Sequence, residues 1–152
     1  MTVTFCGHSY YQQSTEDESI VLSLLNERSA GADIEFFLGE YGEFDRFAYG
    51  CAKKFKKTHP SAKLIFVSPY LGREKTKDTI ELQARRFDLT LYPPIEHIPL
   101  RYAILHRNRW MIEQADLVIA YVKYHRGGAH TSYQYAKRMG REIYNLASNT
   151  FE

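Results

Sequence analysis

Short apolar runs alternate with amphipathic stretches along the whole chain. Runs rich in β-branched and aromatic residues have the length of strands, and several of them end at glycine or proline. They predict six strands, at residues 2–6, 33–38, 63–68, 89–92, 117–122 and 142–146. Between them, apolar residues at helical spacing predict five helices, over residues 16–28, 44–57, 77–87, 99–114 and 131–139.

Strands and helices therefore alternate from one end of the chain to the other. This order predicts an α/β fold, a single domain over residues 1–152 with an open, mainly parallel sheet and helices on both faces. In such a sheet, ligands bind beyond the carboxyl ends of the strands. Three predicted strands end in glycine-bearing loops: Gly7-His8-Ser9, Gly39 to Gly42, and Arg126-Gly127-Gly128. We expect these loops to meet along one edge of the sheet and to form a ligand site there.

The loop after the fifth predicted strand has a recognisable chemistry. It closes on Gly127-Gly128-Ala129-His130-Thr131, and a helical pattern follows. A strand, a glycine turn and a helix start together point backbone N–H groups at an anion, usually a phosphate. The segment also fits an ordinary helix start, because Thr131 and Gln134 have the spacing of a capping box with Thr131 as the N-cap. Capping does not exclude a ligand at the same helix end.

Composition and charge narrow the class of protein. Of the 152 residues, 44% are hydrophobic and 25% are charged, as in a globular domain. The formal net charge of +2 argues against a dedicated nucleic-acid binder. No apolar run has the length of a membrane span, and the N-terminus turns polar too early for a signal peptide. Cys6 and Cys51 fall on predicted core positions, which indicates buried, reduced thiols and a cytoplasmic protein.

The helix predicted over residues 44–57 has one apolar and one basic face. At about 100° per residue, its core arc holds Phe44, Phe47, Ala48, Cys51 and Phe55. Lys53, Lys54, Lys56 and Lys57 fall on the opposite arc, which favours a solvated face over a nucleic-acid patch. Asp45 lies in the first turn, where it either stabilises the helix start or contacts a ligand group such as a ribose hydroxyl.

The helix predicted over residues 99–114 places polar residues among apolar ones. Arg101 and Asn108 share the arc of Leu100, Ile104, Leu105, Met111 and Ile112, and Arg107 borders it. Such groups either hydrogen-bond to backbone or reach a polar cavity at the strand ends, because an unpaired buried polar group costs about 1–3 kcal/mol. The outer arc holds Tyr102, His106, Arg109 and Trp110, which indicates a homodimer surface or a face covered by another loop.

Other common chemistries find little support. His8, His125 and His130 lack the spacing of metal ligands, so we predict no metal site. Ser9, Ser68 and Ser132 lack the context of a nucleophile elbow. The chain has no Walker sequence and no complete GxGxxG fingerprint, and we predict no cofactor.

Three segments taken together resemble the SLOG superfamily. They are FCGHS, GEYGEFDRFA and RNRWMIEQADLVIAYVKYHRGGAHTSYQYAKRMGREIYNL. The resemblance covers most of the chain, is weakest around residues 70–98, and is closest to small bacterial and phage members. SLOG proteins are Rossmann-like and are related to the LONELY GUY nucleotide phosphoribohydrolases and to the DprA/Smf DNA-processing proteins. The resemblance implies a Rossmann-like fold and a nucleotide-derived ligand.

The LONELY GUY enzymes use an arginine and the glutamate of a PGGxGTxxE loop on an N-glycosidic bond. Arg107 matches that arginine, and Gly127, Gly128 and Thr131 match the phosphate loop. The glutamate position holds Gln134, and Arg126 and His130 replace the proline and the third glycine of the loop. Glutamine cannot act as a general base or carry negative charge. The resemblance therefore implies phosphate binding and leaves the catalysis without its carboxylate.

We accordingly expect a sensor or binding protein for a nucleotide or nucleotide-derived phosphate ligand. The expected ligand-binding residues are Gly7, His8, Ser9, Gly39, Gly42, Asp45, Arg107, Asn108, Arg126, Gly127, Gly128, Ala129, His130 and Thr131. The first alternative is an N-glycosidic-bond hydrolase or transferase acting on nucleoside monophosphates. It would use Arg107 with a carboxylate from elsewhere, and the candidates are Glu40, Glu43, Asp45 and Asp116. The second alternative is a DNA-processing module, which would bind DNA in a salt-dependent manner.

Overall fold

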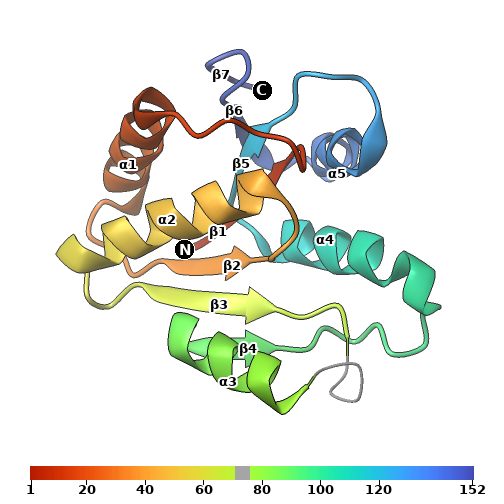
Figure 1. The fold of residues 1–152 in the computed structure, drawn as a ribbon. Coiled ribbons are helices and arrows are strands. Elements are labelled where there is room, and N and C mark those ends of the chain that lie inside the picture. Colours follow the sequence, from red (N-terminus) through yellow and green to blue (C-terminus); the bar gives the residue numbers. More distant parts are fainter. Residues whose placement is uncertain (71–75) are drawn as a thin grey trace.

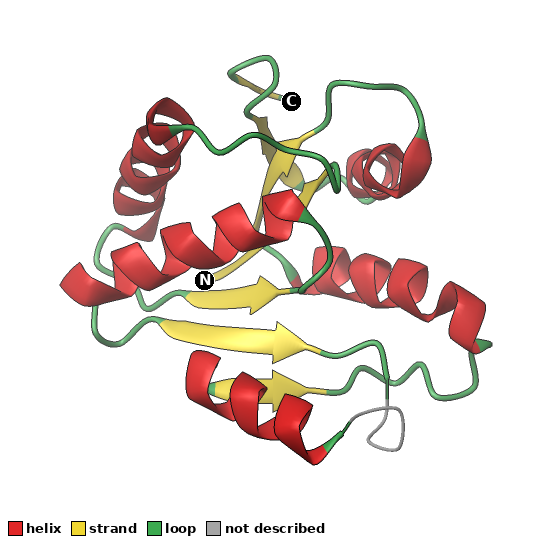
Figure 2. Cartoon of the chain, viewed as in Figure 1, coloured by secondary structure: helices red, strands yellow, loops and turns green. Residues whose placement is uncertain are grey.

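The computed structural model describes residues 1–70 and 76–152. Its strands, as described, are β1 (Thr2–Gly7), β2 (Glu35–Leu38), β3 (Lys63–Val67), β4 (Leu89–Leu91), β5 (Leu117–Tyr121), β6 (Glu142–Asn145) and β7 (Thr150–Phe151). Its α-helices are α1 (Thr15–Ser29), α2 (Glu43–Thr58), α3 (Lys77–Arg86), α4 (Ala103–Gln114) and α5 (Gly127–Arg138), and a 3-10 turn, η2 (Leu100–Tyr102), precedes α4. Figures 1 and 2 show the strands in a twisted layer between helices.

The described strands form one sheet in the order β4-β3-β2-β1-β5-β6-β7. All neighbours are parallel except β6 and β7, which pair antiparallel. β1 therefore lies inside the sheet, with β2 to β4 on one side of it and β5 to β7 on the other. The prediction of a mainly parallel α/β sheet is confirmed. The two-residue strand β7 was not predicted, because a strand this short leaves no periodic signal.

The helices cover both faces of the sheet, as expected. α1, α2 and α3 lie on one face, and α4 and α5 lie on the other (Figure 1). Side chains alternate along β1 accordingly: Val3 and Phe5 belong to the core beneath α1 and α2, whereas Cys6 packs in the core beneath α4 and α5. In the described part of the chain, no helix is both long and apolar enough to cross a bilayer.

The α2 prediction is confirmed in detail. Phe44, Phe47, Ala48, Cys51 and Phe55 are all buried in the core. On the outer face, Lys54 contacts Glu18 and Lys56 contacts Asp88, so the lysine run is a solvated, ion-paired surface. Cys6 and Cys51 are free thiols and buried, also as predicted.

The start of the long helix differs from the prediction. Residues 100–102 form the 3-10 turn η2, so the helical phase of α4 begins only at Ala103. Leu100 is consequently 58% exposed instead of lying in the core, and Arg101 is exposed as well. The buried face of α4 consists of Ala103, Arg107, Met111 and Ile112.

Gly7 is the position at which the fold depends most on the absence of a side chain. A Cβ atom at Gly7 would lie 2.3 Å from Cδ2 of Phe44, inside the core. We expect Gly7→Ala to destabilise the protein by about 1–3 kcal/mol, because the Phe44 ring would have to move within a packed core. Urea unfolding measures this change.

The matched control is Gly50→Ala in the middle of α2. A Cβ atom there has no neighbour within 4 Å among the described residues, and alanine favours the helix by roughly 0.5–1 kcal/mol. We expect this variant to be more stable than the parent chain. Equal effects of the two substitutions would contradict the described packing around Gly7.

Candidate functional site

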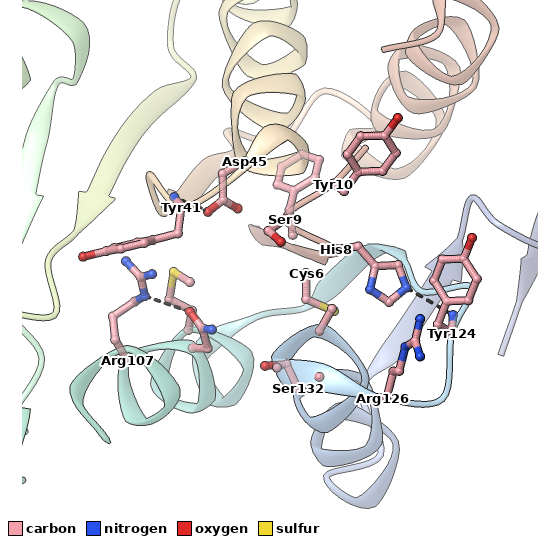
Figure 3. A pocket seen from close by; sticks show the side chains of 17 residues that line it. Cys6, His8, Ser9, Tyr10, Tyr41, Asp45, Arg107, Tyr124, Arg126 and Ser132 are labelled. Atoms are coloured by element: carbon pink, nitrogen blue, oxygen red, sulfur yellow. Dashed lines mark hydrogen bonds between the residues drawn. The ribbon is translucent and has the colours of Figure 1, made fainter. Parts of the chain in front are cut away.

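A cavity of about 550 Å³ opens at the carboxyl ends of β1 and β5 (Figure 3). The strand order explains its position. The chain leaves β1 toward β2 and later returns to β5 on the opposite side, so the connections from these two neighbours diverge. Gaps at such a switch point are where open α/β sheets bind ligands. The walls come from the loop after β1, the start of α2, the face of α4 and the first turns of α5.

The first turn of α5 forms one wall of this cavity. The helix begins at Gly127, and its N-cap residue Arg126 makes no side-chain capping bond. The first N–H groups of a helix have no intrahelical partner, so this turn presents free donors and the positive end of the helix dipole. Gly127 has φ 84°, a conformation that favours glycine. Arg126, Gly127, Gly128 and Ala129 all line the cavity.

Ser132 lies one helical turn further along the same wall. The residue is 1% exposed, and its Oγ has no hydrogen-bond partner in the described part of the chain. Ser132 lines the cavity, and Figure 3 shows its hydroxyl on the side of α5 that faces the opening. An unpaired buried hydroxyl costs about 1–3 kcal/mol. A ligand oxygen in the cavity would supply the missing partner.

Arg107 forms the opposite wall and is the largest side chain that is almost fully buried. Its Nη1 donates to the carbonyl of Val67 at 2.7 Å, and its Nε donates to Oδ1 of Asn108 at 2.8 Å. Burial lowers the pKa of Arg107, and the nearby carboxylate of Asp45 opposes that shift. An arginine stays protonated in proteins, so this group places a fixed positive charge beside the cavity.

Asp45 lines the cavity on the same side as Arg107 and Tyr41 (Figure 3). Its Oδ2 accepts a hydrogen bond from the N–H of Tyr41 at 2.6 Å, which fixes the start of α2. Burial raises the pKa of Asp45, and the hydrogen bond from Tyr41 works in the opposite direction. Both roles considered for this residue are thus open to it: the carboxylate supports a helix start and also faces the cavity.

His8 fixes the loop that leads from β5 into α5. Its Nε2 lies 3.0 Å from the backbone nitrogen of Lys123 and 3.2 Å from that of Tyr124. Both N–H groups donate, so Nε2 is unprotonated and the ring proton is on Nδ1. Burial lowers the pKa of His8, and the positive charge of Arg126 adds to the shift. The loop carrying Tyr124 and Arg126 is therefore tied to the end of β1.

The charges around the cavity favour an anion. Arg107 and Arg126 are positive, Asp45 carries the negative charge, and the helix dipole of α5 adds partial positive charge at the inner wall. A cavity with free N–H donors, a free hydroxyl and two guanidinium groups can hold a phosphate.

Most of the expected ligand-binding residues lie together around this cavity. They are Gly7, His8, Ser9, Asp45, Arg107, Asn108, Arg126, Gly127, Gly128 and Ala129. Ligand contact by these residues stays a prediction. Gly39, Gly42, His130 and Thr131 do not line the cavity, and each has a structural explanation.

The two glycines after β2 serve packing. A Cβ atom at Gly39 would lie 3.0 Å from Nη2 of Arg107, so this glycine makes room for the buried guanidinium. A Cβ atom at Gly42 would lie 2.6 Å from Cα of Ser9, and its φ is 90°. Both glycines line a separate cavity of about 260 Å³ between α2 and α3.

The capping box predicted at Thr131 does not form. Because α5 begins at Gly127, Thr131 lies in the second turn, where its Oγ1 donates to the carbonyl of Gly127 at 3.1 Å. His130 turns toward His125, with ring centroids 5.3 Å apart. The glycines, which the sequence suggested to be a loop, are thus the first turn of the helix itself.

Among the carboxylates proposed for catalysis, Asp45 is the one that lines the cavity. Glu40 is paired with Arg86, and Glu43 forms an ion pair with Arg46 at 3.3 Å. Asp116 accepts from the N–H of Thr2 at 2.8 Å, at the opposite end of the sheet. Gln134, at the position of the LONELY GUY glutamate, is not a lining residue either.

Several lining residues were not among those expected from the sequence. Ser132 was considered only as a nucleophile, although it follows Gly128 by four residues and therefore shares its helix face. This spacing predicts that Ser132 lines the cavity beside Gly128, provided that the helix begins at Gly127. Tyr10, Tyr41 and Tyr124 also line the cavity. Each follows the last residue of its strand by three positions, which places all three at the carboxyl edge.

The outer face of α4 differs in part from the prediction. Trp110 stacks on Phe37 of the sheet, with ring centroids 5.5 Å apart and an interplanar angle of 4°, so it packs inward. Tyr102 is 45% exposed, and Arg109 lies over the ring of Tyr135. A homodimer through this face and a cytoplasmic location stay predictions.

Comparisons with known proteins show the fold. No known family profile matches the chain, and no curated protein matches it. It is similar to DNA processing protein A (DprA) from Streptococcus pneumoniae, with TM-score 0.67, 20% identity and coverage of 95% of this chain and 49% of that chain. It is also similar to DprA from Helicobacter pylori, with TM-score 0.59, 16% identity and coverage of 95% of this chain and 64% of that chain. A third similar structure, TM1055, has TM-score 0.53 and 10% identity, with coverage of 93% of this chain and 71% of that chain.

The chain thus shares the fold of the two DprA chains and of TM1055, and the Rossmann-like fold that the resemblance implied is confirmed. It spans about half to two thirds of the length of the two DprA chains. The structure of the Helicobacter protein concerns its binding of single-stranded DNA. The expectation that nucleic acid is an unlikely partner therefore has no support from the comparisons.

The tie between His8 and the loop before α5 predicts a pH dependence of stability. The pKa of His8 is lowered on folding from its ordinary value of about 6.5. The stability that neutral His8 contributes is fully present above the ordinary pKa. It is lost as the pH falls through the lowered pKa of the folded state, because the unfolded chain binds the proton more readily. We expect the free energy of unfolding, measured in urea between about pH 7.5 and 5, to decrease accordingly.

The control is His8→Gln, which keeps a hydrogen-bond acceptor but does not titrate in this range. We expect the variant to lack the part of the pH slope that His8 causes. Superimposable pH profiles for the two proteins would show that the bonds to Lys123 and Tyr124 do not depend on a neutral imidazole.

Proposed function

We propose that this protein binds a nucleotide or a nucleotide-derived phosphate ligand at the carboxyl edge of the sheet and acts as a sensor or binding protein. The observation that carries this proposal is the unpaired, buried hydroxyl of Ser132, which faces a cavity beside the uncapped first turn of α5. Within the described residues, the hydroxyl has no hydrogen-bond partner and the helix start has no side-chain cap. Phosphate oxygens would supply hydrogen-bond acceptors to both.

The phosphate would occupy the inner wall of the cavity. Its oxygens would accept from the N–H groups at the start of α5 and from Ser132, and the guanidinium of Arg126 would add a charge-assisted contact. The position of these donors on adjacent turns of one helix fits a compact anion with several oxygens.

Gly128 supports this arrangement, because the packing of the described residues does not require a glycine at this position. Its φ lies outside the left-handed region, and a Cβ atom would meet no described atom within 4 Å. The fold therefore tolerates a side chain here, and glycine weakens a helix. Its benefit would be close approach of a ligand to the backbone.

The far wall would hold the rest of the ligand. Arg107 and Asn108 are hydrogen-bonded to each other, and Asp45 lines the cavity near them. A carboxylate and an amide are suitable partners for the hydroxyls of a ribose. A second phosphate would instead sit near Arg107.

We expect Gly128→Asp to abolish the binding of nucleoside phosphates, because it adds bulk and negative charge where the phosphate would sit. Gly128→Ala is the more discriminating change. It should lower affinity by about 5- to 150-fold, since a methyl group forced into a close contact costs on the order of 1–3 kcal/mol. The same methyl group should leave stability unchanged or raise it by up to about 1 kcal/mol. Calorimetry and urea unfolding measure the two effects.

Gly140→Ala serves as the control for the alanine variant, because Gly140 lies beyond the other end of α5 and its φ of 69° makes alanine unfavourable. This control should lose stability and keep affinity. If Gly128→Ala is folded and binds nucleoside phosphates like the parent chain, the phosphate does not lie on this turn.

An N-glycosidic hydrolase or transferase is a second candidate, favoured by one observation. Asp45, whose pKa is raised by burial, lines the same cavity as Arg107. A carboxylate of raised pKa can act as a general acid or base near neutral pH.

Free base is the readout for this activity. Incubation with nucleoside monophosphates should release base in the parent chain and not in Asp45→Asn, if the enzyme hypothesis holds. The binding hypothesis predicts no release from either protein. Release that is unaffected by Asp45→Asn would exclude Asp45 as the source of the chemistry.

Single-stranded DNA is a further candidate partner, favoured by the fold shared with the DprA proteins. It offers phosphates and bases to the same edge. Binding of a fluorescent single strand should then weaken linearly on a logarithmic scale as salt rises. Anisotropy that does not change at low salt would exclude this partner.

A further inference from the structure

Tyr10 is an aromatic ring held in the solvent by rigid neighbours. It is 85% exposed, whereas the following residue, Tyr11, is 5% exposed. The hydroxyl of Tyr11 donates to Asp17 at 2.6 Å, and its ring contacts Phe44 and Phe47. On the other side, the carbonyl of Ser9 accepts from the N–H of Glu43 at 2.7 Å. The backbone around Tyr10 is thus fixed at both ends.

The ring of Tyr10 has no packing role within the described residues. It is largely exposed and makes no hydrogen bond and no ring contact with the described residues. It does line the cavity, and Figure 3 shows its ring beyond Ser9 and His8, on the far side of them from Ser132. A pre-positioned aromatic surface of this kind can bind a planar group without a large ordering cost.

The other two cavity tyrosines are already engaged. Tyr41 lies over the guanidinium of Arg107, and its hydroxyl is 3.3 Å from that of Tyr70. Tyr124 is 51% exposed, with its ring 5.3 Å from that of His8 and the guanidinium of Arg126 5.7 Å from its centre. The ring of Tyr124 is therefore partly covered by His8 and Arg126, whereas the ring of Tyr10 is uncovered.

We propose that Tyr10 stacks on the base of the ligand and makes the site selective for nucleobase-bearing phosphates over other phosphorylated metabolites. This proposal rests on the proposed function, because the phosphate at α5 brings the base to the mouth. The ligand would span the cavity, with its anionic end at Ser132 and its planar end at Tyr10. Every base has a π-face, so the stacking would give a preference for nucleotides without selecting one base.

Calorimetry with three probes tests the proposal: adenosine 5′-monophosphate, cytidine 5′-monophosphate and ribose 5-phosphate. The parent chain should bind both nucleotides more tightly than the sugar phosphate. Tyr10→Ala should lower the nucleotide affinities by about 5- to 150-fold, the range of a lost base–aromatic stack, and leave the ribose 5-phosphate affinity unchanged. Tyr10→Phe should keep the affinities of the parent chain.

Tyr102→Ala is the matched control, because Tyr102 is also exposed, at 45%, but does not line the cavity. A short thymidine oligonucleotide forms a further arm that distinguishes a free nucleotide from a strand as the source of the base. Tyr10→Ala should weaken whichever of the two binds, and salt dependence identifies the strand.

Three outcomes overturn the proposal in different ways. If nucleotides bind and their affinity depends on Gly128 but not on Tyr10, the stacking role is wrong and the proposed function stands. If neither nucleotides nor the oligonucleotide bind the parent chain, both fail. Equal losses for the nucleotides and for ribose 5-phosphate in Tyr10→Ala would show that Tyr10 only shapes the mouth.

Discussion

The divergence of the chain on either side of β1 is the constraint on which the site depends. α1 and α2 cover one face as the chain passes from β1 through β2 to β3. The other face is covered by α4, which leads back to β5, and by α5, which follows β5. Neither set covers the carboxyl ends of β1 and β5, which pair side by side as far as Gly7 and Tyr121. Both loops that follow these ends contribute to the cavity wall, and His8 ties them together.

A buried arginine links the architecture to the chemistry of the cavity. Arg107 fastens α4 to the end of β3 through the carbonyl of Val67, and Gly39 leaves space for its guanidinium. A buried charge is costly unless it is paired and hydrogen-bonded, and these contacts together with the nearby Asp45 meet that need. The same charge favours an anion in the cavity. One residue thus serves both packing and electrostatics, which explains why its position on a mostly apolar helix face looked anomalous in the sequence.

The sequence predicted the periodic parts of the structure and not the starts of α4 and α5. The strands and the core face of α2 follow from spacing alone, because burial imposes a period of two or 3.6 residues. Spacing placed Arg107 only at the border of an apolar arc, and the residue both donates to a backbone carbonyl and lines the cavity. The start of α5 did not follow, since a glycine pair reads equally well as a loop or as an uncapped first turn. That error hid Ser132, which shares a face with Gly128 only if the helix begins at Gly127. Tyr10 was missed because an exposed tyrosine has no pattern until its neighbours are placed.

The central claim is that the first turns of α5 and the end of β1 together hold a phosphate-bearing nucleotide. Titration of the isotopically labelled protein with nucleoside 5′-monophosphates, followed through its backbone amide resonances, tests this claim most directly. The account predicts saturable shifts concentrated at residues 127–132 and 7–10, with smaller changes near Arg107. An absence of shifts, or shifts confined to the cavity between α2 and α3, would contradict it.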